Sequence, residues 1–247
     1  MLTDCTHIEF IGAGACSIVS KAKRNSVDVI VSIKQIDEKR YNQKEYIIQS
    51  QLDHKNIAQV YELKEDEAYY YIIMEYYDGL DLAKYVKHNE LTIDKITCIL
   101  LQIVDALEYC HSRHIYHRDI KLNNILIKNL DSLEIVVIDF GFATQQETIL
   151  TDYPGSPRYA SPELISGIPY RGEKSDVWAT GVLLYYLLIG EYPFKGRIRK
   201  VLIEQIKYTD PLKDCQLPNK YIDLLSKMLS KKQADRPTMT EIKNYLN

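Results

Sequence analysis

The fold is decided by two short stretches, HRDIKLNN at residues 117–124 and DFG at residues 139–141. The first stretch contains Asp119 and, five positions later, Asn124, and the second begins with Asp139. Transfer of a phosphoryl group needs a carboxylate beside the attacking hydroxyl and oxygen ligands for Mg²⁺ close to it. Asp119 is the candidate for that carboxylate, while Asn124 and Asp139 offer oxygen atoms, which a hard cation prefers. The two stretches therefore predict a magnesium-assisted phosphoryl-transfer site.

A glycine-containing segment lies upstream of this site. Residues 12–19 read GAGACSIV and fall between two runs rich in β-branched residues, so a strand follows the glycines. A dinucleotide-binding fingerprint would be followed by a helix instead. Residues 31–34 read VSIK, an apolar strand that ends in one lysine. In this order the two signals resemble the phosphate-covering loop and the third-strand lysine of the protein kinases.

The hydrophobic pattern around these motifs predicts a strand-rich first part and a helical second part. One helix-compatible stretch, residues 42–52, interrupts the strands, and Thr92 is the candidate N-cap of a later helix. Residues 174–189 predict a helix that is apolar on nearly all sides and therefore buried. We expect a cleft between the two parts. The expected strands are 8–11, 18–23, 27–36, 57–63, 68–74, 125–127 and 134–138, and the expected closing helices are 221–229 and 239–246.

On these motifs the chain resembles the eukaryotic protein kinase family over essentially its whole length. The resemblance implies an α+β, two-lobed fold, in which a small lobe has five antiparallel strands and one helix and a larger lobe is mainly helical. It implies one kinase domain over residues 1–247, with the small lobe at about 1–74, a hinge at about 75–80 and the larger lobe at about 81–247. The expected activity is ATP-dependent, Mg²⁺-assisted phosphorylation of serine and threonine hydroxyls on protein substrates.

The resemblance also implies roles for individual residues. Asp119 is the catalytic base, and Lys121 contacts the γ-phosphate. Lys34 holds the α- and β-phosphates and pairs with Glu45. Asn124 and Asp139 are the metal ligands and also belong to the ATP site. The other ATP-binding residues are Gly12, Ala13, Gly14 and Val19 in the covering loop, Ser32, Met74, Glu75 and Tyr77 around the adenine, and Asp81 near the ribose.

Motifs downstream resemble the substrate-binding and structural parts of the same family. Residues 155–163 read GSPRYASPE and resemble the peptide-binding end of the activation segment. Asp176 resembles the residue that braces the catalytic loop from a buried helix, and Arg236 resembles the usual partner of Glu163. We expect these three residues to be structural. Residues 163–170 read ELISGIPY and are most similar to the calmodulin-dependent and AMP-activated kinase branch.

Two alternative functions are weighed against the active kinase. The first is a pseudokinase that binds nucleotide and acts as a scaffold, and it is disfavoured because the phosphate, base and metal residues are all present. The second is a kinase-fold phosphotransferase for small molecules, and it is disfavoured because residues 155–163 resemble a peptide-holding segment. Lys121 after the base, together with that segment, is the serine/threonine pattern.

Four features depart from the family pattern. Ser17 stands where the third loop glycine is usual, and its side chain costs some close approach. Ser32 replaces an alanine and adds a hydroxyl that needs a partner. Gln49 replaces an apolar residue, and a buried amide there weakens the active arrangement unless it is hydrogen-bonded. Glu45 follows Lys34 after only eleven positions, although an extended connection still lets the two side chains pair.

The activation segment, residues 139–163, matches the family without gaps. Asp152 then occupies the position that is usually phosphorylated, with Thr151 beside it and Ser156 further along. In the family that phosphate pairs with the arginine before the base, here Arg118. A carboxylate supplies about half of the charge of a phosphate, so we expect basal activity without an upstream kinase. A shift of one residue would make Thr151 the phosphosite instead.

Composition excludes several other classes of protein. The 247 residues are 46% hydrophobic and 26% charged, which is ordinary for a globular chain. A net charge of −3 offers no basic field for nucleic acid, and the longest apolar run, residues 177–189, is too short for a bilayer span. Five scattered cysteines indicate free thiols in a reducing compartment. We expect an intracellular monomer, in the cytoplasm and/or the nucleus, that binds ATP, Mg²⁺ and protein substrates but neither nucleic acid nor membrane.

Overall fold

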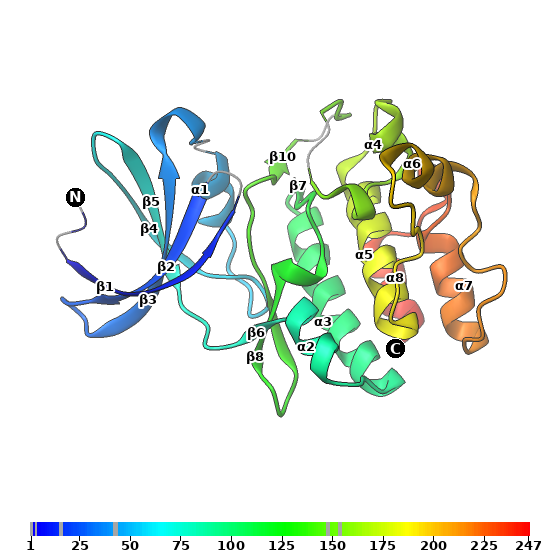
Figure 1. Cartoon of the computed structure of the whole chain (residues 1–247), viewed down its shortest axis with the longest axis horizontal. Helices are drawn as coiled ribbons and strands as arrows, with labels where there is room; N and C mark the ends of the chain where they lie inside the picture. The colour runs from blue at the N-terminus through cyan, green and yellow to red at the C-terminus, as the bar shows by residue number, and fades with distance from the viewer. Residues whose placement is uncertain (1, 3, 15–16, 42–43, 147–148, 153–154) are drawn as a thin grey trace.

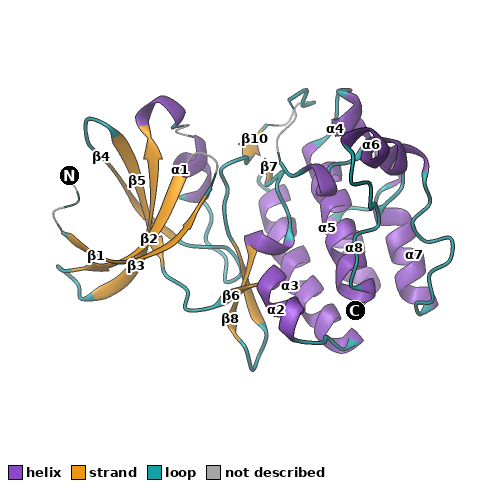
Figure 2. Cartoon of the chain, in the orientation of Figure 1, coloured by secondary structure: helices purple, strands orange, loops and turns teal. Residues whose placement is uncertain are grey.

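Strands and helices occupy opposite ends of the molecule (Figure 1; Figure 2). The computed structural model describes residues 2, 4–14, 17–41, 44–146, 149–152 and 155–247. Strands dominate residues 5–75, and helices dominate the residues that follow, so the expected α+β class is confirmed. The lobe boundaries at about 74 and 80 stay a prediction.

An antiparallel sheet of five strands forms the first part, in the order β1-β2-β3-β5-β4. β3 lies at its centre and places Lys34 opposite Val19 on one neighbour and Ile72 on the other. Ile72 and Ile73 are fully buried, which gives the sheet its core. The strands are β1 (Cys5–Ala13), β2 (Ser17–Arg24), β3 (Val29–Asp37), β4 (Val60–Glu65) and β5 (Tyr69–Glu75).

One short α-helix, α1 (Lys44–Gln49), accompanies the sheet within the described residues. It lies inside the expected stretch 42–52, of which residues 42–43 are outside the described residues. The 3₁₀ turn η1 (Glu38–Arg40) follows β3 directly, so the connection to α1 is short. α1 buries Glu45 and Gln49 on the side that faces the rest of the molecule.

Helices make up most of the second part and pack around α5 (Gly172–Ile189), the helix expected to be apolar all round. Val177, Trp178 and Val182 on this helix are fully buried. α3 begins after Thr92, whose hydroxyl accepts a hydrogen bond from Lys95 N as expected. The other helices are α2 (Leu82–His88), α3 (Ile93–His111), α4 (Pro162–Ser166), α6 (Arg199–Tyr208), α7 (Asn219–Met228) and α8 (Met239–Leu246).

Short strands hold the two motifs where the sheet meets the helices. The loop at 117–124 begins after β7 and ends at β8, and Asp139 follows β9. β8 pairs with both β6 and β9, while β7 pairs with β10. These elements are β6 (Leu80–Asp81), β7 (Ile115–Tyr116), β8 (Ile125–Asn129), β9 (Glu134–Val137) and β10 (Thr144–Gln145), with 3₁₀ turns η2 (Leu122–Asn124), η3 (Pro157–Tyr159) and η4 (Gln233–Asp235).

Among the helices formed by the described residues, none combines the length and the apolar character that crossing a membrane requires.

Candidate active site

A cleft of about 680 Å³ lies where the sheet meets the helical part. Every residue expected to bind ATP, from Gly12 in β1 to Asp139, lines this cleft. Glu45 lines it as well. Residues far apart in the sequence therefore meet at one site.

Lys34 joins two carboxylates at the inner end of the cleft. Its Nζ lies 2.5 Å from Glu45 Oε1 and 2.8 Å from Asp139 Oδ1. Burial lowers the pKa of Lys34, but the two carboxylates outweigh it and the pKa is raised. Burial raises the pKa of Glu45, and Lys34 offsets only part of that effect. The structure thus contains the Lys34–Glu45 pair expected from sequence despite the short connection between them.

The Asp139 carboxylate is favoured in its charged form and is partly exposed to the cleft. Burial raises its pKa, yet the nearby Lys34 ammonium outweighs burial and the pKa is lowered. The side chain is 40% exposed, so the cleft can reach it. Its backbone has a φ of 65°, in the left-handed region that L residues rarely adopt. The neighbouring Phe140 is fully buried and packs against the ring of His117, with ring centroids 4.7 Å apart.

Asp119 is fixed by donors from three other residues. Its Oδ2 accepts from Lys121 Nζ at 2.5 Å and from Asn124 Nδ2 at 3.1 Å. Its Oδ1 accepts from the amide and the hydroxyl of Ser156, both at 3.1 Å. Asp119 is itself buried. The expected base, the expected phosphate-contacting lysine and a residue of the activation segment therefore form one network.

Asp176 braces the loop before Asp119, as expected from sequence. This fully buried carboxylate accepts from the backbone N–H groups of His117 and Arg118 at 2.9 and 2.8 Å. It also lies 2.9 Å from His111 Nε2, a partner that sequence reasoning missed. Burial raises the pKa of Asp176, but the bond from His111 and the neighbouring donors outweigh burial and lower it. The brace holds Arg118 at a φ of 64°, a second left-handed residue beside the site.

Gln49 is hydrogen-bonded, which removes the concern raised by the sequence. Its side chain is buried, and Nε2 donates to the carbonyl of Ala58 at 2.9 Å. The bond ties α1 to the chain that enters β4. Since Glu45 lies one turn earlier on α1, the same bond helps to hold Glu45 against Lys34.

Arg118 and Asp152 form an ion pair at the activation segment. Arg118 Nη1 contacts both carboxylate oxygens of Asp152, at 2.6 and 2.7 Å. Its Nε donates to the carbonyl of Phe142 at 2.8 Å, and Nη1 also lies 3.3 Å from the hydroxyl of Tyr170. Burial lowers the pKa of Arg118, but Asp152 and Tyr170 outweigh it and the pKa is raised. Thr151 is exposed beside this pair, and residues 153–154 are outside the described residues.

Gly155 brings the next part of the segment against the catalytic loop. It has a φ of 90°, and a Cβ at this position would lie 2.7 Å from the carbonyl oxygen of Arg118. Further on, Glu163 and Arg236 form a buried pair with two contacts of 2.5 and 2.7 Å. Arg236 also donates to the carbonyl of Ser230 at 2.9 Å. The expected structural pair is present and shapes the end of the segment.

Asp81, Ser32 and the glycine-containing segment lie at the cleft as expected, with hydrogen bonds or burial that the sequence did not predict. Asp81 caps α2 by accepting from Lys84 N at 2.9 Å, and its Oδ2 lies 3.2 Å from Lys84 Nζ, so its carboxylate also serves the fold. Ser32 is buried at the cleft. The carbonyl of Ser17 accepts from Gly14 N at 2.8 Å, so the end of β1 and the start of β2 are hydrogen-bonded beside the cleft.

Sequence reasoning missed several apolar residues of the cleft, among them Leu126 on β8 and Ile138 after β9. Both flank the metal-ligand candidates within two residues in the sequence. The signal available was their place in apolar strands directly beside Asn124 and Asp139.

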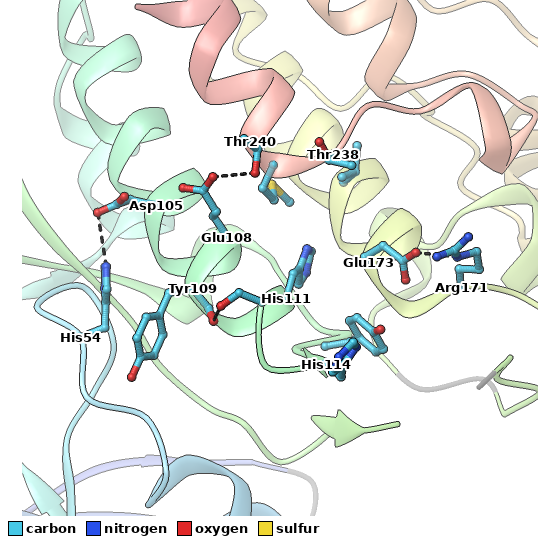
Figure 3. A pocket seen from close by; sticks show the side chains of 14 residues that line it. His54, Asp105, Glu108, Tyr109, His111, His114, Arg171, Glu173, Thr238 and Thr240 are labelled. Carbon is cyan, nitrogen blue, oxygen red and sulfur yellow. Dashed lines mark hydrogen bonds and ion pairs between the residues drawn. The ribbon is translucent and has the colours of Figure 1, made fainter. Parts of the chain in front are cut away.

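A second cavity of about 670 Å³ lies among α3, α5 and α8 (Figure 3). Its polar side chains pair with neighbours: His54 Nε2 lies 3.3 Å from Asp105 Oδ2, and Glu108 accepts from the Thr240 hydroxyl at 2.6 Å. Among its described lining residues there is none that the sequence assigned to catalysis or to ATP. The first cleft is therefore the candidate site.

Comparison with known proteins agrees with this site. A family model described as the protein kinase domain matches residues 5–246. A probable serine/threonine-protein kinase of Dictyostelium discoideum is 36% identical over 84% of this chain and 25% of its own length. NUAK family SNF1-like kinase 1 of Homo sapiens is 36% identical over 96% of this chain and 37% of its length. The mitosis inducer protein kinase cdr1 of Schizosaccharomyces pombe is 35% identical over 94% of this chain and 40% of its length. The chain thus spans between a quarter and two fifths of the length of these relatives.

Proposed function

Because this chain belongs to the protein kinase family, we propose that it transfers the γ-phosphoryl group of ATP to serine and threonine hydroxyls of protein substrates. The observation that carries this proposal is that Lys34, Glu45 and Asp139 form an ion network that lines the cleft. Asn124 lines the same cleft, and its bond to Asp119, which also accepts from Lys121, links the expected base to it. Two of the relatives named above are serine/threonine kinases or SNF1-like kinases, which supports the same substrate class.

The donor set fits ATP with Mg²⁺. Asn124 uses its amide nitrogen on Asp119, which leaves its side-chain oxygen available to a metal, and Asp139 presents a partly exposed carboxylate. One carboxylate and one amide oxygen, completed by phosphate oxygens and water, suit the coordination that Mg²⁺ prefers. When bound, the metal neutralises charge that develops on the phosphoryl oxygens. Lys34, held by Glu45, positions the α- and β-phosphates.

Asp119 acts on the substrate hydroxyl. Its carboxylate is oriented by Lys121, Asn124 and Ser156, so one oxygen can receive the hydroxyl proton while the transferred group leaves ATP. Lys121, 2.5 Å from that carboxylate, brings a positive charge to the place where the γ-phosphate arrives.

We further propose that Asp152 supplies a built-in charge for the activation segment. Its contact with Arg118, the residue directly before Asp119, supports this role. The consequence is appreciable basal activity in protein that carries no phosphate. Thr151 is the competing site, because it is exposed and adjacent.

The place of action proposed is intracellular, in the cytoplasm and/or the nucleus. The four described cysteines, Cys5, Cys98, Cys110 and Cys215, are free thiols, which suits a reducing compartment. A monomeric state stays a prediction.

The experiment uses purified protein, Mg-ATP and a generic basic protein as acceptor. Asp139→Asn and Lys34→Met should each lower kcat at least about a hundredfold, because a metal ligand or a phosphate-positioning charge is lost. Asp131→Asn, the same change at an exposed turn, is the matched control and should keep full activity. Undiminished transfer by folded Asp139→Asn contradicts the proposal. A wild type that binds nucleotide but transfers nothing supports the scaffold alternative.

A further inference from the structure

A groove separate from the ATP cleft runs between α4 and α6. It encloses about 400 Å³, with Leu164 and Ile165 on the α4 side and Leu202, Ile203 and Ile206 on the α6 side. Figure 1 shows the two helices side by side at the end of the molecule away from the sheet. The walls are aliphatic, so the groove suits apolar side chains.

Exposed aliphatic residues extend this apolar surface beyond the groove. Ile198, directly before α6, is 68% exposed and precedes Arg199, which lines the groove. On the other side, Ile168, just after α4, is 51% exposed. Single exposed apolar residues are common, but two of them directly beside the lining residues of one apolar groove enlarge its apolar surface, as at an interaction site.

Unpaired cations border the groove. Arg197, Arg199 and Lys200 are all exposed, and none of them forms an ion pair with another described residue. Arg199 also lines the groove. Glu204, one turn along α6 from Lys200, likewise lacks an ion pair among the residues described. Positive charge at the start of a helix disfavours that helix, so the fold itself does not account for this cluster.

The groove adjoins the catalytic network. Pro157 lines it, and the preceding residue, Ser156, donates to Asp119 through both its amide and its hydroxyl. A chain bound in the groove therefore lies next to the segment that reaches the proposed base. This closeness to the proposed base favours a substrate, and not a regulatory partner, as the chain that binds in the groove.

We propose that the α4–α6 groove docks a segment of the protein substrate in which aliphatic residues alternate with acidic ones. That the bound segment belongs to a substrate rests on the proposed function, whereas the binding of such a segment to the groove does not. Aliphatic side chains fill the groove, and carboxylates face Arg197, Arg199 and Lys200. Complementary charge at such a rim accelerates association and selects the partner, and it weakens as salt rises.

The binding test uses a fluorescein-labelled peptide, EDLEILDE in one-letter code, and its basic counterpart, KRLKILRK, with no ATP present. At low salt the wild type should bind the acidic peptide about tenfold more tightly than the basic one, and the preference should shrink at 0.5 M NaCl. The double change Arg199→Glu with Lys200→Glu should weaken acidic-peptide binding at least about tenfold. Ile203→Ala, which removes part of the apolar wall, should weaken it about fivefold or more. The matched control reverses two exposed lysines of α2 and α3, Lys87→Glu with Lys95→Glu, and should bind as the wild type does.

A second arm asks whether the occupant is a substrate. EDLEILDE is fused to a serine-containing acceptor peptide, and KM should fall for the wild type but not for the Arg199→Glu/Lys200→Glu protein, with kcat unchanged by the fusion. Equal binding of both peptides, or equal binding by the reversed variant, overturns the proposal. Binding without any effect of the fusion on KM overturns the substrate assignment and indicates a non-substrate partner. A wild type that binds the acidic peptide but phosphorylates nothing supports the docking site and contradicts the proposed function instead.

Discussion

Asp152→Asn isolates the charge that Asp152 brings to Arg118. The substitution keeps the size of the side chain and one carbonyl oxygen but removes the negative charge. Arg118 is 9% exposed, so it depends on protein partners, whereas Asp152 is 59% exposed. After the change Arg118 keeps the carbonyl of Phe142 and the hydroxyl of Tyr170. The activation segment therefore loses its charged contact with Arg118, and its contact through the Phe142 carbonyl remains.

The size of the effect follows from this geometry. Both carboxylate oxygens contact the same nitrogen, Nη1, so the pair lacks the two parallel bonds of a forked arginine–carboxylate contact. The exposure of Asp152 also places the pair near the values of surface ion pairs, about 0.5–1 kcal/mol. That corresponds to about a two- to fivefold fall in the ratio of ordered to displaced segment. We expect kcat/KM to fall by no more than this factor and the difference to shrink at high salt.

The assay uses protein expressed in bacteria, treated with phosphatase and shown by mass spectrometry to carry no phosphate. Wild type, Asp152→Asn and Thr151→Ala are compared with the same acceptor at low and high salt. Thr151→Ala should match the wild type, because Thr151 contributes no charge before modification. The reasoning is refuted if phosphate-free wild type is inactive, phosphate on Thr151 restores activity, and Asp152→Asn changes nothing.

Three further outcomes are expected. Glu163→Ala leaves the buried Arg236 without its carboxylate and should lower the free energy of unfolding in urea by about 3–5 kcal/mol, and a loss below about 1 kcal/mol would contradict this. Burial raises the pKa of Asp176, but its hydrogen-bond donors lower the pKa by more, so the folded-state pKa lies below the usual value. The charged carboxylate therefore stabilises the fold above about pH 4, and this stabilisation is lost as the pH falls through the lowered pKa. Asp176→Asn should therefore be less stable at pH 7 and should lose less stability between pH 5 and 2 in acid titrations followed by circular dichroism. Gln49→Leu leaves the Ala58 carbonyl unpaired and should cost about 1–3 kcal/mol in the same urea titration, and an unchanged midpoint would show that the bond contributes nothing.

The sequence predicted most accurately where chemistry restricts residue type and spacing. Asn124 and Asp139 were expected at one site and both line the cleft, and Asp119 is hydrogen-bonded to Asn124. Their roles as metal ligands and base in phosphoryl transfer stay predictions. Helices were also predictable where the apolar pattern is long, as in α5, or where a capping box marks the start, as in α8.

Short elements and long-range contacts were not predictable. α2 and α6 were not expected, and α6 has neither a side-chain cap nor an acidic first turn to mark where it begins. The expected strand at 57–63 begins only at Val60, because Ile57 and Ala58 pair with Val137 instead. The bond from Gln49 to the Ala58 carbonyl likewise depends on how the chain returns after α1, which no local pattern encodes.

The left-handed backbone at Arg118 and Asp139 lowers the stability of the fold at two residues that the proposed activity requires. A non-glycine residue held in that conformation costs about 1–3 kcal/mol, and glycine would adopt it freely. In a library selected only for resistance to heat, glycine at position 139 would thus be favoured by the backbone, while the carboxylate beside Lys34 would be lost. Descendants of this chain that no longer needed their activity would drift toward such substitutions. A glycine in the first position of the DFG motif of a related chain would then indicate both a lost activity and a more stable fold.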